Sequence, residues 1–129
     1  MSLNRTVIHS DSAPKAIGPY SQAIRVGDLI FAAGQTPIDP ATGNLVEGDI
    51  ETQTRRVLLN IKVVLEAAGS GLDKVVKTTV FMTNLGDFAR MNAVYGEYFP
   101  ANPPARSTVQ VAALPKAAQV EIECVAVVG

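Results

Sequence analysis

Two segments near the end of the chain carry ionisable side chains within otherwise apolar stretches. Residues 105–111 alternate like a strand and place Arg106 on one face. Residues 120–128 alternate in the same way and place Glu121 and Glu123 together on one face. If both strands belong to one sheet, an anion-binding guanidinium and a proton-transferring carboxylate can project into a shared cleft. The competing interpretation is a cross-strand ion pair on a solvated face, which adds little stability.

The chain has few other side chains suited to catalysis or metal binding. It contains one histidine, one cysteine and no tryptophan. A zinc site needs several closely spaced ligands, which His9 and Cys124 do not supply, so we expect no metal. We expect His9 to lie at the surface and Cys124 to be a small core residue. If the chain is an enzyme, then arginine, carboxylates, hydroxyls and backbone groups carry its chemistry without a cofactor.

Length and composition narrow the classes of protein to which the chain can belong. Its 129 residues suffice for one domain, which we expect to span residues 1–129. Its 47% hydrophobic content and net charge of −1 are typical of globular proteins. The pI near 5.7 argues against binding of nucleic acid. No apolar run is long enough to span a bilayer or to act as a signal segment, so we expect a cytoplasmic protein without membrane contacts.

Hydrophobic periodicity predicts an alternation of strands and helices. Gly27-Asp28 suits a tight hairpin, Asp49 is a good helix N-cap, and Gly69 suits the position just after a helix. Thr36–Gly48 is a long loop rich in turn residues, and loops of that length are usually functional or part of an interface. We expect strands over residues 6–8, 20–26, 29–33, 75–82, 105–111 and 120–128, and helices over residues 50–68 and 87–99.

The order of these elements is β-β-β-α-β-α-β-β, and each helix connects two strands. Right-handed crossovers place both helices on the same side of the sheet. We therefore expect a two-layer α+β fold, with one mixed sheet packed by two helices. In the fourth strand, Val76 is expected to share a face with Thr78 and Val80. The second sheet face carries apolar residues such as Val125 and Val127, which favours burial against other copies of the chain.

Several separated motifs resemble those of a known protein family. The clearest is Pro104-Ala105-Arg106-Ser107-Thr108-Val109, followed by Leu114-Pro115 and Val120-Glu121-Ile122-Glu123. Together with other segments in the same order, they are similar to the motifs of the reactive-intermediate deaminase (Rid) family. The resemblance implies the chorismate-mutase-like fold and a homotrimer with sites in the clefts between neighbouring subunits. The other matching segments are Ile17–Ala23, Ala33–Pro37, Val76–Phe81 and Asp87-Phe88, with Asn92 and Tyr95.

The activity that the resemblance implies is hydrolysis of 2-imino acids, or their enamine tautomers, to 2-keto acids and ammonia. The substrates would be small, such as 2-iminobutanoate and 2-iminopropanoate. No cofactor is needed, because the protonated imine carbon is already electrophilic. The resemblance makes Arg106 the group that binds the substrate carboxylate and Glu121 the group that transfers protons. It also places four further residues around the substrate: Tyr20, Gly34, Thr108 and Asn92.

Other interpretations of these residues stay open at this point. Tyr20 also suits a structural role as a half-buried tyrosine, and Asn92 suits one as a hydrogen bonder on its helix. Gly34 can simply end a strand. Glu123 is either a rival general base or part of an ion pair at a subunit interface.

Two positions depart from the pattern of the family's archetype. Thr108 stands where a cysteine is common, and Ala33 stands where a serine is common. These changes do not exclude imine hydrolysis, but they put thiol chemistry and substrate preference in question.

Two other functions compete with the deaminase. One is an endoribonuclease that inhibits translation, and the other is a non-catalytic trimer that binds small carboxylates.

Overall fold

The structure is a computed structural model that describes residues 4–129. Six strands and two α-helices follow one another in the expected order, with three short 3-10 helices between them. The strands are β1 (Arg5–Ile8), β2 (Ala23–Val26), β3 (Leu29–Gln35), β4 (Val75–Met82), β5 (Ala105–Gln110) and β6 (Val120–Val127). The helices are α1 (Ile50–Ala67), α2 (Phe88–Tyr98), η1 (Leu72–Lys74), η2 (Leu85–Asp87) and η3 (Pro115–Ala117).

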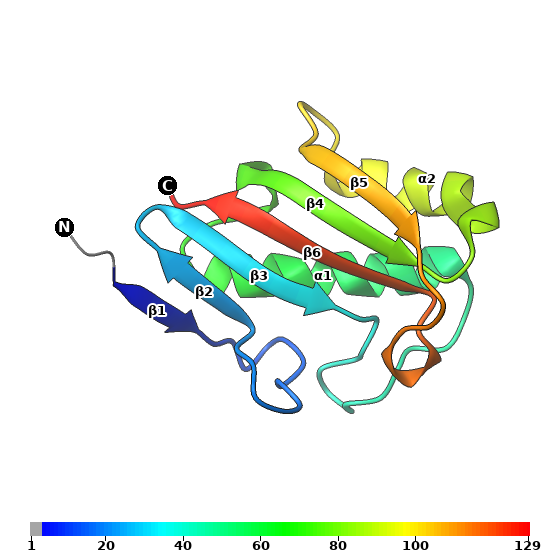
Figure 1. Cartoon of the computed structure of the whole chain (residues 1–129), viewed down its shortest axis with the longest axis horizontal. Helices are drawn as coiled ribbons and strands as arrows, with labels where there is room; N and C mark the ends of the chain where they lie inside the picture. The colour runs from blue at the N-terminus through cyan, green and yellow to red at the C-terminus, as the bar shows by residue number, and fades with distance from the viewer. Residues whose placement is uncertain (1–3) are drawn as a thin grey trace.

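All six strands form one mixed sheet in the order β1-β2-β3-β6-β4-β5. β4 and β5 run parallel because α2 connects them as a crossover, whereas every other neighbouring pair is antiparallel. Both helices pack on the same face of the sheet, which is the far face in Figure 1. The expected two-layer α+β architecture is therefore confirmed, and it is consistent with the chorismate-mutase-like fold.

The core lies between the sheet and the two helices. α1 begins after Asp49, whose side chain accepts a hydrogen bond from the Thr52 N–H at 2.9 Å. The helix ends before Gly69, where the chain turns with a φ of 78°. One stripe of α1 packs against the inner face of β6 and its neighbours. The fully buried aliphatic residues of these two elements are Ile50, Val57, Leu58, Ile61, Val64, Leu65, Val120, Ile122 and Ala126.

The second strand begins at Ala23. The alternation of the sequence predicted that it begins at Tyr20. The side chain of Gln22 binds the preceding loop instead of continuing the strand. Its Nε2 donates to the carbonyl oxygens of Ser10 and Pro14, and its Oε1 accepts from the Ser10 N–H. These hydrogen bonds bury Gln22 and hold the residues before β2 in a turn. The predicted start of this strand is therefore wrong.

β4 contains a bulge at Val76. Val75 is opposite Ala126 of β6, and Lys77 is opposite Val125, so one extra residue of β4 lies between two consecutive residues of β6. Val75 is consequently buried, whereas Val76 is 46% exposed. The expectation that Val76 shares a face with Thr78 and Val80 is therefore wrong, because the bulge interrupts the alternation.

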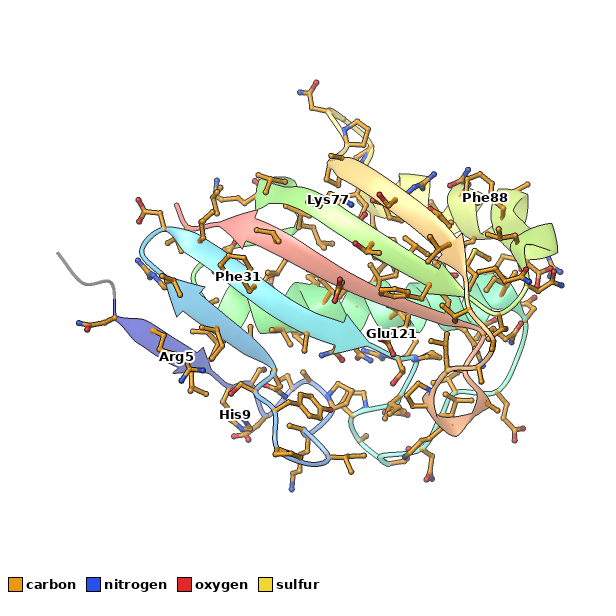
Figure 2. The ribbon with its side chains drawn as sticks, in the orientation of Figure 1. Arg5, His9, Phe31, Lys77, Phe88 and Glu121 are labelled. Atoms are coloured by element: carbon orange, nitrogen blue, oxygen red, sulfur yellow. The ribbon has the colours of Figure 1, made fainter. Side chains whose placement is uncertain are left out.

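The sheet face opposite the helices is uncovered in the single chain. Its apolar residues include Leu29, Phe31 and Val109, which are 42%, 46% and 42% exposed. Figure 2 shows Phe31, Lys77 and Glu121 along this face of the sheet. The expectation of an apolar second face is therefore confirmed. In the part of the chain from residue 4 onward, no helix is long and apolar enough to cross a membrane.

Candidate functional site

Arg106 lies on the edge strand β5 and points toward the helix layer. It is opposite Thr78 of β4, whose side chain is buried beneath α2. The Arg106 Nη1 donates to Asn92 Oδ1 at 2.7 Å. The Arg106 Cζ lies 4.7 Å from the centre of the Tyr95 ring and 5.3 Å from the centre of the Phe88 ring. These three partners lie on one stripe of α2, because residues 88, 92 and 95 are each about one helical turn apart.

Arg106 lines an open cavity of about 400 Å³ beside α2, here called the Arg106 cavity. Within residues 4–129, no carboxylate forms a salt bridge with this guanidinium. Asn92 accepts a hydrogen bond from only one nitrogen of the guanidinium, so the other guanidinium N–H groups are left for a ligand. The cavity thus presents a cation with donors suited to an anion. Its other lining residues are Tyr95, Gly96, Phe99, Pro103 and Pro104.

Thr108 follows Arg106 on the same face of β5 but lies outside the lining of the Arg106 cavity. It is opposite Val80, which is fully buried. Its Oγ1 is also buried and has no hydrogen-bond partner in the described part of the chain. The Thr108 side chain therefore faces packed protein, and the residue lines neither the cavity beside Arg106 nor the cavity beside Glu121.

Glu121 projects from β6 on the uncovered face of the sheet. It lines a different cavity, of about 350 Å³, here called the Glu121 cavity. Tyr20 and Gly34 line the same cavity, so the fold brings three of the predicted site residues together. Tyr20 is half exposed, and its hydroxyl accepts a hydrogen bond from the Ile17 N–H at 3.3 Å. The other lining residues are Ile17, Thr36, Ile38, Pro115 and Lys116.

Gly34 leaves the space that the Glu121 carboxyl group occupies. A Cβ at position 34 would lie 2.9 Å from Glu121 Cδ and closer still to Oε1, which is tighter than real Cβ contacts. β3 continues through Gly34 to Gln35, and its register against β6 shifts between Ala32 and Gln35. The interpretation that Gly34 ends the strand is therefore wrong. The absence of a side chain at position 34 lets Glu121 take its place in the cavity.

The surroundings of Glu121 favour its protonated form. Burial raises the pKa of the Glu121 carboxyl above its usual range, and the negative charge of Glu123 raises it further. A carboxyl group with a raised pKa is suited to exchanging protons with a reacting group. Glu123 itself is exposed and lines a separate, smaller cavity of about 170 Å³. Of the two carboxylates, only Glu121 shares a cavity with Tyr20 and Gly34.

Arg106 and Glu121 project from opposite faces of the sheet. β4 lies between their strands and pairs with both, so that Thr78 is opposite Arg106 and Phe81 is opposite Glu121. Paired residues share a face, and the face alternates along a strand. Because Thr78 and Phe81 are separated by an odd number of positions, the two charged side chains point apart. Figure 2 shows Glu121 on the near side of the sheet. The interpretation that both project into one cleft is therefore wrong within a single chain.

Sequence reasoning missed residues in both cavities. Phe88 and Tyr95 match the family's motifs but were not predicted as site residues, yet both rings lie over Arg106. Their spacing with Asn92 (i, i+4, i+7) was the signal that could have linked them to one partner. Lys116 has a φ of 58°, and its Nζ donates to the Gly43 carbonyl at 3.0 Å. No local signal marks Lys116, because this contact joins residues 73 positions apart.

The Cys124 thiol and the His9 imidazole line neither the Arg106 cavity nor the Glu121 cavity. Cys124 is buried, and burial raises the pKa of its thiol to about 12, which keeps it protonated. His9 is exposed, with its Nε2 2.8 Å from Asp11 Oδ1. Both residues therefore lie where the sequence predicted. Among residues 4–129, no three His, Cys, Asp or Glu side chains are grouped so that they could hold a metal ion.

The chain is similar over nearly its whole length to proteins of one family. Residues 10–128 match the family model described as Endoribonuclease L-PSP. The chain is 57% identical to Protein DfrA of Myxococcus xanthus, over 95% of each chain. It is 47% identical to the chloroplastic Reactive Intermediate Deaminase A of Arabidopsis thaliana, over 97% of this chain and 67% of that protein.

The likeness extends to solved structures. The E. coli protein TdcF, solved with bound serine, is 43% identical and superposes with a TM-score of 0.92. The match covers 96% of this chain and 99% of TdcF. Sequence and fold therefore lead to one conclusion: the chain belongs to the YjgF/RidA family, which the family model describes as Endoribonuclease L-PSP and which includes reactive-intermediate deaminases.

Proposed function

We propose that this protein is a cofactor-independent deaminase that hydrolyses small 2-imino acids, or their enamine tautomers, to 2-keto acids and ammonia. The Arg106 guanidinium supports this most directly, because it faces a cavity without a carboxylate partner among the described residues. A planar guanidinium binds a carboxylate through two parallel hydrogen bonds. TdcF was solved with serine, an amino acid that carries such a carboxylate. The substrates we infer are 2-iminobutanoate and 2-iminopropanoate.

The complete site is proposed to form between two copies of the chain. Since Arg106 and Glu121 face opposite sides of the sheet, a small ligand that contacts both must lie between different copies. The Arg106 edge of one copy would then meet the Glu121 face of the next, and such head-to-tail contacts generate a closed ring when the rotation between copies closes. We infer a homotrimer, in which each copy contributes Arg106 to one site and Glu121 to another. Such a ring would also cover the exposed apolar residues around Phe31.

In this site Arg106 would hold the substrate carboxylate while Glu121 removes a proton from a water molecule. The water oxygen attacks the imine carbon, and the C=N π electrons move to nitrogen to give a tetrahedral carbinolamine. Glu121 then returns the proton to nitrogen and the C–N bond breaks. The hydroxyl oxygen becomes the keto oxygen as its proton passes to Glu121, which releases it to ammonia to give ammonium. The raised pKa of Glu121 supports these transfers. The Tyr20 hydroxyl accepts from Ile17, so its proton is free to orient the water.

A coupled assay tests this proposal. A threonine dehydratase generates 2-iminobutanoate, and loss of the imine is followed with and without the protein. We expect the rate to rise in proportion to the protein concentration. An imine that decays at the uncatalysed rate, in the presence of protein that still binds 2-oxobutanoate, would instead indicate a non-catalytic carboxylate-binding protein.

The description of the matching family model favours a second candidate function, endoribonuclease activity. RNA cleavage usually relies on cationic contacts with phosphates, and the chain carries a net charge of −1. RNA-degrading activity that follows the protein through every purification step, and that persists in Arg106→Ala and Glu121→Gln, would favour this candidate. Activity that separates from the protein would identify a contaminant.

A further inference from the structure

Tyr95 is a buried tyrosine whose ring lies against the Arg106 guanidinium. The residue is 5% exposed, and the Arg106 Cζ is 4.7 Å from the ring centre, within the range of a cation–π contact. The hydroxyl groups of Tyr95 and Thr78 form a hydrogen bond of 2.7 Å. Thr78 is also the residue directly opposite Arg106 in the β4–β5 pairing. Tyr95 therefore connects the guanidinium to the strand position next to it.

The contacts of Tyr95 fix the direction of its ring. Thr78 is 1% exposed, so the two hydroxyls satisfy each other where water does not reach. The Phe99 ring packs against Tyr95 at a centroid distance of 4.7 Å and an interplanar angle of 41°. Burial raises the pKa of Tyr95, so the phenol stays neutral and its face remains electron-rich. Phenylalanine would fill most of this volume without burying a hydroxyl, so the tyrosine is suited to orientation as well as to packing.

Three side chains of α2 together orient the guanidinium. Asn92 accepts a hydrogen bond from one N–H group of Arg106. The Arg106 Cζ lies 4.7 Å from the centre of the Tyr95 ring and 5.3 Å from the centre of the Phe88 ring. A free arginine side chain loses considerable rotamer entropy when a ligand orders it, and that loss weakens binding. Here the three side chains of α2 already contact the guanidinium in the single chain, and its remaining donors are available in the Arg106 cavity.

We propose that Tyr95 is a positioning residue, whose ring is held by Thr78 and orients the Arg106 guanidinium for a substrate carboxylate. The inference rests on the proposed role of Arg106 in binding that carboxylate. Because Tyr95 contacts the guanidinium rather than the reacting carbon, removal of its ring weakens binding and leaves the chemical step at Glu121 intact. Removal of the hydroxyl alone keeps the ring beneath Arg106 and has a smaller effect.

Carboxylate binding by a set of variants separates this role from simple packing. The probe is 2-oxobutanoate, titrated calorimetrically into the intact assemblies of wild type, Tyr95→Leu, Tyr95→Phe and Tyr98→Leu. Tyr98 is the matched control, because it lies on the same helix and forms no cation–π contact with Arg106. We expect Tyr95→Leu to raise the Kd about tenfold. Tyr95→Phe restores most of the affinity, and Tyr98→Leu leaves it unchanged.

Kinetics give a second measure of the same variants. In the deaminase assay, Tyr95→Leu is expected to raise KM by a factor similar to that on the Kd and to retain kcat. A folded Tyr95→Leu protein with the wild-type Kd would overturn the positioning role. The same holds if Tyr95→Phe and Tyr95→Leu weaken binding equally, because the ring would then contribute nothing of its own.

A measurement on the wild-type protein keeps the test independent of variant stability. The Arg106 Nε–Hε resonance, assigned by its absence in Arg106→Lys, is expected upfield of those of other arginines because of the Tyr95 ring current. Nuclear Overhauser contacts with the Tyr95 ring protons are expected as well. An unshifted resonance without these contacts overturns the positioning role, even if 2-oxobutanoate binds. A shifted resonance in a protein that does not bind 2-oxobutanoate overturns the proposed function instead, and with it the carboxylate part of this inference.

Discussion

Arg106 and Glu121 face opposite sides of one sheet, although a single strand, β4, separates the strands that carry them. The arginine lies beneath α2 beside Asn92, and the glutamate lies on the uncovered face beside Tyr20 and Gly34. One copy of the chain therefore holds both groups of the proposed reaction and cannot apply them to one small molecule. If both groups act together, activity is a property of the assembly.

Two inactive variants should consequently restore activity when they are mixed. Arg106→Ala copies keep Glu121, and Glu121→Gln copies keep Arg106, so in the proposed trimer every mixed assembly has one interface at which both groups are intact. Random assembly from equal amounts makes about three quarters of the trimers mixed, and the mixture is expected to show about a quarter of wild-type activity. The variants are unfolded together, refolded and assayed for loss of 2-iminobutanoate.

The control for this mixture replaces the Glu121→Gln chain with an Arg106→Ala/Glu121→Gln double variant, which carries neither the guanidinium nor the carboxylate. That mixture should stay inactive. If the first mixture is no more active than its separate components, although differently tagged chains co-purify, then the two residues do not form a site between copies.

Gly34→Ala should disable Glu121 without touching the Arg106 cavity. The added methyl group would overlap the Glu121 carboxyl, so the carboxyl is displaced from the cavity. We expect kcat to fall about a hundredfold, the range of a lost general acid–base group. The affinity for 2-oxobutanoate should change far less.

The same substitution should also lower the free energy of unfolding, by roughly 1–3 kcal/mol, as overpacking does. Urea denaturation of Gly34→Ala, Glu121→Ala and the double variant measures this cost and its origin. In the Glu121→Ala background the methyl group has space, so its cost should largely disappear. An equal cost in both backgrounds would show that Gly34 is needed for the backbone rather than for Glu121.

The pH dependence of kcat/KM should report the raised pKa of Glu121. Activity falls as the pH is lowered through that pKa, because protonation removes the base that activates water. The charge of Glu123 is one of the two causes of the raised pKa, so Glu123→Gln should move the acidic limb to lower pH while burial keeps part of the shift. The measurement is a pH–rate profile of both proteins. Superimposable profiles would mean that Glu123 does not act on the catalytic group.

Glu121→Gln should stabilise the protein at neutral pH. A raised folded-state pKa means that the folded chain binds the Glu121 proton more tightly than the unfolded chain does. The stability that this proton contributes is fully present below the unfolded pKa of about 4.3, and it is lost as the pH rises through the folded pKa. Glutamine has no proton to lose, so the gain in Tm of the variant over wild type should be larger at pH 7 than at pH 4. A gain that is the same at both pH values would contradict this account.

Phe31→Glu should dissociate the proposed assembly and abolish activity together. Phe31 is 46% exposed on the uncovered sheet face and lines neither the Arg106 cavity nor the Glu121 cavity. A buried, unpaired carboxylate opposes association strongly. Light scattering after size-exclusion chromatography measures the mass. The control is Ala67→Glu, since Ala67 is exposed on α1, in the layer on the other side of the sheet, and it should leave both mass and activity unchanged.

Much of the fold could be predicted because its signals are local. Asp49 and Gly69 mark the two ends of α1, and Gly27 marks the hairpin between β2 and β3. Errors occurred where a distant contact overrides the local pattern. Gln22 alternates like a strand residue but binds the loop at Ser10, and the bulge at Val76 is visible only against β6.

The candidate site could be predicted as a set of residues but not as an arrangement. Whether Arg106 and Glu121 face the same way depends on which strand lies between them and on its register with both. Neither fact is encoded in the alternation of β5 or β6 alone. The role of Gly34 was hidden for a similar reason, because the side chain that excludes a Cβ there comes from another strand.

The place of β6 in the sheet has a consequence for biosynthesis. β6 is the last of the six strands along the chain, yet it lies between β3 and β4. A nascent chain that has left the ribosome only as far as β5 therefore has two open strand edges where the finished protein has none. Joining them requires pairing across long stretches of sequence, which is slow and leaves unpaired edges prone to aggregation. We expect this protein to complete its sheet only when translation of β6 is finished, and to need chaperones most just before that moment.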